Sequence, residues 1–436
     1  MPVNTGSIQL YPIQIRSQAP TVEHIPSAIE TAVEQIIQSS DRLQKLKPGA
    51  RIAITAGSRG IANYVEIMKA VVKCLQAKGY EPFLFSAMGS HGRGEASGQR
   101  EVLDSLGITA DAVHCPVSCS SELVVLDTLK AFDRSIPVYC AKEAVEADGV
   151  IVINRIKPHT SFRGDYESGL FKMMAVGMGR AKGADMFHGF GAGLLADMIP
   201  LIGRSIIQHA PIVGGIGIIE NANERTAIIE GMGYEQIPER EKELLNQAKQ
   251  FMPRLPVDTM DICIIEEMGK NYSGTGMDTN IIGRMRIEGI KEPEKPHITY
   301  LGVLRLSEAS HGNANGIGLA DLTTETLVQS VDKTATYLNC MTAGFAVRAA
   351  IPMTFPDDRA LLEGALKMLR LKDIKDLRMV VIRNTLHIDH VWVTEAIYED
   401  IKAEQGIVLA DEPFPLAFDK EGNWRWNDVH GTVNRS

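Results

Sequence analysis

The chain has 436 residues, of which 44% are hydrophobic and 23% charged, and its formal net charge is −9. This length favours more than one domain, and the acidic balance argues against a surface that binds nucleic acid or anionic lipid. No apolar run approaches the roughly 18 residues that span a membrane, and the start lacks a signal pattern, so we expect a cytoplasmic protein without a membrane partner. Six dispersed cysteines indicate reduced thiols.

The first half of the chain alternates apolar strand patterns, glycine-rich loops and helix patterns. Residues 51–55 form a short β-branched run, residues 56–60 a loop with two glycines, and residues 62–77 an amphipathic helix pattern. The same order recurs with strand 82–86 and loop 87–94. This alternation predicts a parallel sheet wrapped by helices, in which ligands gather at the carboxyl ends of the strands.

A stretch that begins with the apolar strand 150–153 concentrates reactive side chains. A proline ends the strand pattern, and His159 follows it in a polar loop. Lys172 lies inside an apolar helix pattern over residues 170–178, and His188 precedes another glycine-rich turn. Two imidazoles and an amine at the end of a buried strand are costly for packing alone, so this stretch predicts a functional site.

Arg59, His91 and His159 each follow a buried strand, so we expect them at one edge of the sheet. Imidazole suits both proton transfer and metal binding, and the forked guanidinium suits a carboxylate. The backbone at Gly89 could approach an anion, although no nucleotide-binding fingerprint accompanies it. Lys172 taken alone could equally extend its stem along an apolar helix with its amine in water.

The second half repeats the α/β pattern after a proline-containing linker at residues 251–256. We therefore expect an α/β fold of two α/β domains with largely parallel sheets flanked by helices, and an active site in the cleft between them. The expected boundaries are 1–255 for the domain that carries the reactive residues, 256–400 for a second domain that closes the cleft, and 401–436 for a tail that packs back on the first domain.

These motifs resemble the nickel-pincer-nucleotide-dependent lactate racemase family over most of the chain. Arg59 in TAGSRG is similar to the family's arginine for the substrate carboxylate. His91, in a small-Gly-x-His loop, and His159, in PHTSFRG, are similar to its two acid/base histidines. Lys172 after a Ser-Gly pair resembles the lysine that holds the cofactor covalently, and His188, sixteen residues later, resembles the nickel ligand.

The resemblance implies further contacts and partners. Gly89, Gly169 and Asn280 would bind the cofactor, a nickel-bearing pyridinium bisthiocarboxylic acid mononucleotide attached to Lys172, and Lys270 would contact the substrate. The implied activity is racemisation or epimerisation of a 2-hydroxy acid by transient hydride transfer. The implied partners are this small-molecule substrate and proteins that build the cofactor, with no nucleic acid, and the chain could form a homo-oligomer.

The loop from His159 to Lys172 is longer than the family's and carries Asp165, Tyr166 and Glu167, so we expect a more polar or larger substrate than lactate, such as a sugar acid. Two alternatives stay open at this point. A zinc hydrolase could use His91, His159 and His188 as metal ligands. A homologue without cofactor could bind a 2-hydroxy acid without turning it over.

Overall fold

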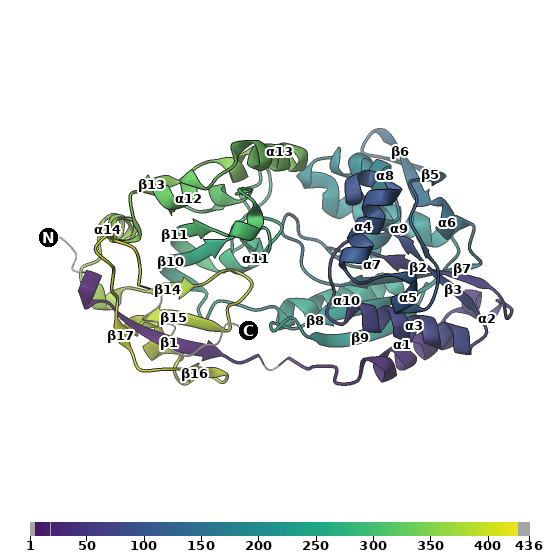
Figure 1. Ribbon diagram of the computed structural model, residues 1–436, viewed down its shortest axis with the longest axis horizontal. Helices are drawn as coiled ribbons and strands as arrows, with labels where there is room; N and C mark the ends of the chain where they lie inside the picture. Colours follow the sequence, from purple (N-terminus) through teal and green to yellow (C-terminus); the bar gives the residue numbers. More distant parts are fainter. Residues whose placement is uncertain (1–4, 18, 426–436) are drawn as a thin grey trace. The chain divides into compact units, whose positions relative to one another are not determined.

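The computed structural model describes residues 5–17 and 19–425 and divides them into two compact units (Figure 1). Ala19–Met252 form the first, here called the N-unit. The second, the C-unit, takes the described residues of Met1–Gln18 and of Pro253–Ser436. Each unit has its own sheet, so the chain is an α/β protein with two mixed, largely parallel sheets flanked by helices, as its sequence predicted.

The N-unit is built on a six-stranded sheet of β2 (Arg51–Ala56), β3 (Glu81–Ser86), β4 (Val117–Ser118), β7 (Gly149–Arg155), β8 (Ile212–Glu220) and β9 (Thr226–Gly233). Their order is β4-β3-β2-β7-β8-β9, and every neighbouring pair is parallel except β8 with β9. The chain runs outward from β2 to β4 and then returns to β7 on the other side of β2. The order of connection therefore reverses between β2 and β7, which is where open sheets of this kind bind ligands.

Helices cover both faces of this sheet, because its strands are apolar at nearly every position. Ile151 and Ile153 of β7 join one core with residues of the first helices, whereas Val150 and Val152 join a second core with residues of the later ones. The helices are α1 (Ile25–Ser39), α2 (Asp41–Gln44), α3 (Tyr64–Ala77), α4 (Ala96–Ser105), α5 (Ala110–Val113), α6 (Lys142–Val145), α7 (Leu170–Lys172), α8 (Arg180–His188), α9 (Leu195–His209) and α10 (Ile237–Phe251).

The C-unit carries a nine-stranded sheet in the part of the chain that the structure describes. Its strands are β1 (Gln9–Ile15), β10 (Thr259–Met268), β11 (His297–Leu306), β12 (Leu322–Thr324), β13 (Met353–Phe355), β14 (Met379–Ile382), β15 (His390–Thr394), β16 (Ile407–Leu409) and β17 (Phe414–Pro415). Strands β13, β12, β11, β10 and β14 are parallel, and β15, β1 and β16 continue the sheet antiparallel. Its helices are α11 (Thr279–Ile282), α12 (Glu325–Gln329), α13 (Lys333–Ala343), α14 (Asp358–Leu369) and α15 (Glu395–Ile401).

The two ends of the chain correct the expected domain boundaries. The break after residue 252 lies close to the expected one, but β1 belongs to the C-unit, where it pairs with β15. The tail, expected on the first domain, also packs in the C-unit: the amide of Leu416 donates to the carbonyl of Ile8 at 2.9 Å, and that of Trp424 to Asp358 at 2.9 Å. Residues 426–436 lie outside the described residues.

Three local features differ from the sequence expectations. The pattern of residues 26–46 predicts one helix, whereas the structure divides it at Ser40, whose hydroxyl accepts the Leu43 amide and caps α2. The helix expected over residues 170–178 is the short α7 followed by a π-helical turn, η3 (Met173–Gly177). An antiparallel hairpin of β5 (Leu123–Ala131) and β6 (Arg134–Ala141) was not foreseen, and it packs near α8 and α9.

In the described residues no single helix has the length and apolar character to cross a membrane. Only the pair Arg180–His188 and Ala192–His209, bent by 102°, meets those two criteria when taken together.

Candidate functional site

A pocket of about 240 Å³ opens at the carboxyl ends of β3, β2 and β7, three neighbouring strands of the N-unit sheet. Here it is called the strand-end pocket. It lies at the reversal of strand order between β2 and β7, as expected for an open parallel sheet. Every residue of its wall belongs to the N-unit, so a site between the two units stays a prediction. The polar side chains of the wall are Ser58, Arg59, Tyr64, Ser90, His91, Asn154, Arg155, Lys157, Ser168, Lys172 and His188.

The loop after β2 brings Arg59 to this pocket. The amide of Gly57 donates to the Tyr64 hydroxyl at 2.9 Å, which ties the loop to the first turn of α3. Although part of Arg59 is exposed, desolvation of its guanidinium, and then the neighbouring charge of Arg155, lower its pKa from the ordinary value. Among the described residues no carboxylate forms an ion pair with Arg59, so its guanidinium is suited to an anionic ligand.

His91 lies in the loop after β3. In the sheet, β3 and β7 are the two neighbours of β2. Gly89 has φ +59°, a conformation that favours glycine, and its amide donates to the carbonyl of Gly177 at 3.3 Å. This contact links the His91 loop to η3. Although part of His91 is exposed, desolvation of its ring lowers its pKa, and the charges of Arg59 and Lys172 lower it further. The ring is therefore biased toward the neutral form that can accept a proton.

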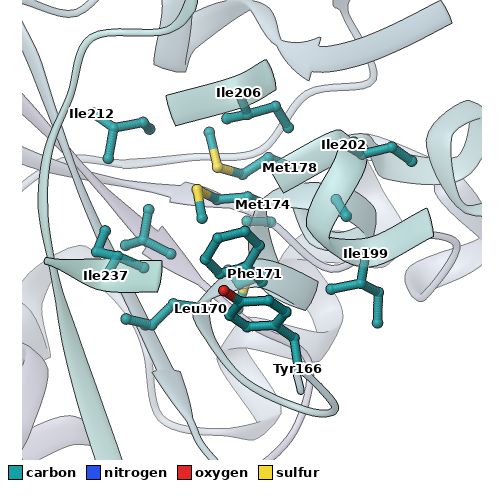
Figure 2. Packing of buried hydrophobic residues seen from close by; sticks show 14 of the residues in the cluster. Tyr166, Leu170, Phe171, Met174, Met178, Ile199, Ile202, Ile206, Ile212 and Ile237 are labelled. Carbon is teal, nitrogen blue, oxygen red and sulfur yellow. The ribbon is translucent and has the colours of Figure 1, made fainter. Parts of the chain in front are cut away.

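Lys172 ends α7 and is held by the core beneath it. The neighbouring residues Leu170 and Phe171 are fully buried, and Figure 2 shows the Phe171 ring among the side chains of α9 and η3. Burial, and then the charges of Arg59 and Lys157, lower the pKa of the Lys172 amine from 10.5 to about 7. A substantial fraction of this amine is thus uncharged at neutral pH, which makes it nucleophilic.

A carboxyl group from α10 supports this helix. Glu241 is 1% exposed, and its Oε2 accepts the Phe171 amide at 2.9 Å. Burial raises the pKa of Glu241 to about 8. Its carboxyl occupies the space that a Cβ at Gly169 would need. Gly169, expected at the cofactor, lies outside the pocket wall, and the structure shows that its lack of a side chain makes room for Glu241.

His188 ends α8, whose start is anchored in the interior. Arg180 is 1% exposed and binds both oxygens of Glu143, at 2.8 and 2.9 Å. At the other end the ring of His188 lines the pocket, and burial and the Lys172 charge lower its pKa. A neutral imidazole is the form that binds metal ions. Lys182, a second lysine on the same helix, is exposed and absent from the wall.

His159 lies beside the pocket rather than in its wall. Burial lowers its pKa well below the ordinary value, and the charges of Lys172 and His188 contribute, which places these groups near one another. Its Nδ1 accepts the Ser161 amide at 3.1 Å, so the neutral ring carries its proton on Nε2. The ring stacks on Phe162 with a centroid distance of 4.1 Å.

The extra residues of the His159 loop turn away from the pocket. Tyr166 is 2% exposed, stacks on Phe171 at 4.0 Å and donates its hydroxyl to the carbonyl of Pro238 (Figure 2). Glu167 is fully buried and accepts the backbone amide of His159 at 2.7 Å. Asp165 is exposed and outside the wall. This segment therefore fixes the loop, and it gives no support to the expectation of a sugar acid.

Two expected contacts, Lys270 and Asn280, belong to the C-unit. The Lys270 amine donates to the carbonyl of Gly274 at 2.6 Å and to Asn339 at 2.8 Å. The side-chain amide of Asn280 donates to Asp278 at 2.9 Å. Both thus support loops of their own unit, and a contact with substrate or cofactor stays a prediction.

Sequence reasoning missed three residues of this site. Arg155 ends β7 and Lys157 follows it, and both line the pocket, so the strand-end rule that selected Arg59 would have selected them. Glu241 lies seventy residues from the amide that it accepts, so only the fold connects it with α7.

The donor set fits a metal group that brings most of its own ligands. Among the described residues no cluster of three His, Cys, Asp or Glu side chains that could hold a metal ion is found, so the structure gives no support to a zinc site made by His91, His159 and His188. A pincer nucleotide supplies sulfur and carbon donors itself and needs one further ligand, which His188 can provide. The uncharged fraction of the Lys172 amine suits a covalent attachment beside it.

A family model and two solved structures are similar to this chain. Residues 6–190 match the family model of the lactate racemase N-terminal domain. The lactate racemase apoprotein of Thermoanaerobacterium thermosaccharolyticum is similar in fold, with a TM-score of 0.51 at 11% identity, covering 86% of this chain and 94% of that one. A protein of Thermotoga maritima reaches a TM-score of 0.46 at 16% identity, over 66% of this chain and 71% of its own. No curated protein sequence matches the chain.

Proposed function

We propose that the chain is a racemase or epimerase of a 2-hydroxy acid that uses a nickel-pincer nucleotide. The premise is that residues 6–190 match the family model of the lactate racemase N-terminal domain. The observation that carries the proposal is the convergence of Arg59, His91, Lys172 and His188 on the strand-end pocket, with His159 beside it. These side chains come from separate loops and helices, yet they combine an anion site, proton-transfer groups, a reactive amine and a metal donor.

Lys172 and His188 are the residues that would hold the cofactor. The Lys172 amine, with its pKa near 7, would form the covalent link, and the His188 imidazole would complete the nickel coordination. When bound, this group accepts and returns the hydride of the C2 carbon. The cation-rich wall around it suits the negative charge of a nucleotide phosphate.

The remaining residues would bind the substrate and move its proton. Arg59 would hold the carboxylate in a forked geometry. His91 and His159 would act as base and acid on the substrate hydroxyl, because both rings have lowered pKa values and can accept a proton. The two rings come from loops after different strands, β3 and β7, and inversion needs proton transfer at two positions around one carbon.

A tethered cofactor also requires partners that make it, so cofactor-maturation proteins belong to this proposal. The alternative of a cofactor-free binding homologue shares the pocket but predicts no turnover. A homo-oligomer stays a prediction.

The test is inversion of single enantiomers. The chain, made in a host that builds the cofactor, is incubated with one enantiomer of each member of a 2-hydroxy acid panel, and chiral chromatography follows the products. The proposal expects at least one acid to approach an equilibrium mixture. If no acid is inverted by protein that carries the nickel group, the proposal is wrong.

A further inference from the structure

His159 is held by its own loop at both its backbone and its ring. Its backbone amide donates to the Glu167 carboxylate at 2.7 Å, and its carbonyl accepts the Arg163 guanidinium. Its ring stacks on Phe162, and Nδ1 of the ring accepts the Ser161 amide at 3.1 Å. Because backbone and ring are both fixed, the imidazole is held in one orientation beside the strand-end pocket.

Glu167 is fully buried, and its partner comes from α10. The Lys249 amine lies 2.9 Å from Oε1 of Glu167, and the Arg163 guanidinium lies further away, 3.9 Å from Oε2. A buried ion pair often adds no more to stability than apolar side chains of the same volume. The pair is therefore better explained by the hydrogen bond that Glu167 accepts from the His159 amide than by stability alone.

Helix α10 holds the same loop at a second place, where Glu241 accepts the Phe171 amide at 2.9 Å. Lys249 lies about two turns further along α10, so both side chains extend from one side of the helix. Lys249 acts through Glu167 at the start of the loop, and Glu241 acts at its end, on α7. One contact can therefore be removed while the other shows whether the loop still packs on α10.

We propose that Glu167 and Lys249 are positioning residues for His159: the buried carboxylate fixes the histidine backbone, and the amine from α10 fixes the carboxylate. The imidazole then keeps the orientation in which Nδ1 accepts the Ser161 amide and Nε2 carries the proton. This inference rests on the proposed function for the acid/base role of His159. It gives Glu167, in the extended loop, a role in orienting a reactive ring rather than in contacting the substrate.

The test compares two double variants that differ in one group. Glu167→Gln with Lys249→Met keeps an acceptor for the His159 amide, whereas Glu167→Met with Lys249→Met removes the acceptor and keeps a side chain of similar length. Both variants remove the two charges of the pair together. Hydrogen exchange of the Ser161 amide, followed by NMR on the full chain without cofactor, reports on its bond to the His159 ring. Exchange should stay within about threefold of the wild type in the first variant and be at least about tenfold faster in the second.

The Phe171 amide is the internal control, because Glu241 accepts it and neither variant changes Glu241. Its exchange should be the same in both variants as in the wild type. If the Phe171 amide loses protection together with the Ser161 amide, Glu167 has a merely structural role and the inference is overturned. Equal exchange of the Ser161 amide in the two variants overturns it as well.

Turnover of the cofactor-loaded enzyme provides a second readout. The variant without the acceptor should lower kcat by roughly 10- to 10²-fold, because the ring of His159 is misplaced. KM should stay within about twofold, since Arg59 would still hold the carboxylate. Asp148→Ala removes the acceptor of the Arg51 amide at the start of β2 and should change neither constant. An equal kcat in the two double variants would contradict the inference. Because exchange is measured without cofactor, a failure of racemisation would be seen separately.

Discussion

The two units end their parallel strands in similar loops but use them differently. In the N-unit the loops after β2, β3 and β7 turn charged side chains toward a pocket and shift their pKa values. In the C-unit the loops after β10 and β11 bind one another: the amide of Lys270 donates to the Ser310 hydroxyl at 2.8 Å, and the Ser307 hydroxyl donates to Asn271 at 2.6 Å.

This difference teaches that glycine-rich loops after strands are not sufficient evidence of a site. Lys172 and Lys270 were both expected at the site, Lys172 as the attachment residue and Lys270 as a substrate contact. Only Lys172 has its amine in a cationic wall with a pKa near 7, whereas the Lys270 amine is hydrogen-bonded to oxygens of its own unit. Substitution of Lys270, which stabilises its loop, should therefore lower stability. Substitution of Lys172, whose charged form is costly to bury, should lower activity without a loss of stability.

The largest expected effect is on catalysis in the N-unit. His91→Ala and His159→Ala should each lower the turnover of the cofactor-loaded enzyme by roughly 10²- to 10⁴-fold, because each removes a proton-transfer group. Nickel content should stay at the wild-type level, since neither histidine is the proposed ligand. Polarimetry measures the rate, and metal analysis the nickel.

The matched control is His297→Ala, at an exposed position at the start of β11 in the C-unit, which should leave the rate unchanged. Near wild-type turnover in both N-unit variants would remove the acid/base roles from these histidines.

The next expected effect is on the free energy of unfolding, which should differ between variants of Lys270 and Lys172. Lys270→Met should lower the free energy of unfolding of the C-unit by about 1–3 kcal/mol, because the oxygens of Gly274 and Asn339 lose a charged donor. The tryptophans of the described residues, Trp392 and Trp424, both lie in the C-unit, so urea unfolding followed by tryptophan fluorescence reports on it. An unchanged midpoint would contradict the structural role of Lys270.

Lys172→Met should behave in the opposite way, with no loss of N-unit stability at pH 7 in urea unfolding followed by circular dichroism. The folded-state pKa of Lys172 is about 7 against an ordinary 10.5, so between these pH values the unfolded chain holds a proton that the native chain lacks. The contribution of this group to stability therefore rises from about pH 7 to 10.5. If the free energy of unfolding changes with pH between 7 and 10.5 by the same amount in the wild type and in Lys172→Met, the amine is not buried as described.

The smallest expected effect concerns Glu241, whose folded-state pKa is about 8 against an ordinary 4.5. Between these values the native chain holds a proton that the unfolded chain has lost, so the stability that this group contributes falls as the pH rises from about 4.5 to 8. Glu241→Gln keeps an acceptor for the Phe171 amide and cannot ionise. Its stability relative to the wild type should increase over this range in parallel urea titrations. A constant difference would show that the folded-state pKa of Glu241 is not raised.

A variant of the same helix provides the comparison. Glu243 is more exposed and pairs with Arg240 at the surface, so Glu243→Gln should change stability by no more than about 1 kcal/mol.

The location of Arg59 and His91 at the carboxyl ends of strands could be predicted from the sequence, because it follows from local patterns. Buried runs followed by glycine-rich loops place Arg59 and His91 after adjacent parallel strands, and such strands share an edge. The stretch after strand 150–153 indicated Lys172 and His188, the resemblance to a known family suggested their roles, and the structure brings both to the same pocket.

Features that depend on distant contacts were not predictable in this way. Strand β1 pairs with β15, near the other end of the chain, and no local pattern encodes that partner. Glu241 meets α7 only because α10 packs beside it. The π-helical turn after Lys172 has the same apolar composition as an α-helix, so helical periodicity alone could not distinguish them.

The central claim is that Lys172 holds a nickel-bearing group in the strand-end pocket. Intact mass and nickel content, measured on the wild type, Lys172→Ala and Lys182→Ala from a host that builds the cofactor, test it most directly. The account predicts a covalent mass increment and bound nickel in the wild type and in Lys182→Ala, and no increment in Lys172→Ala. An unmodified, nickel-free wild type from a host in which a lactate racemase is loaded, or an increment that persists in Lys172→Ala, would contradict it.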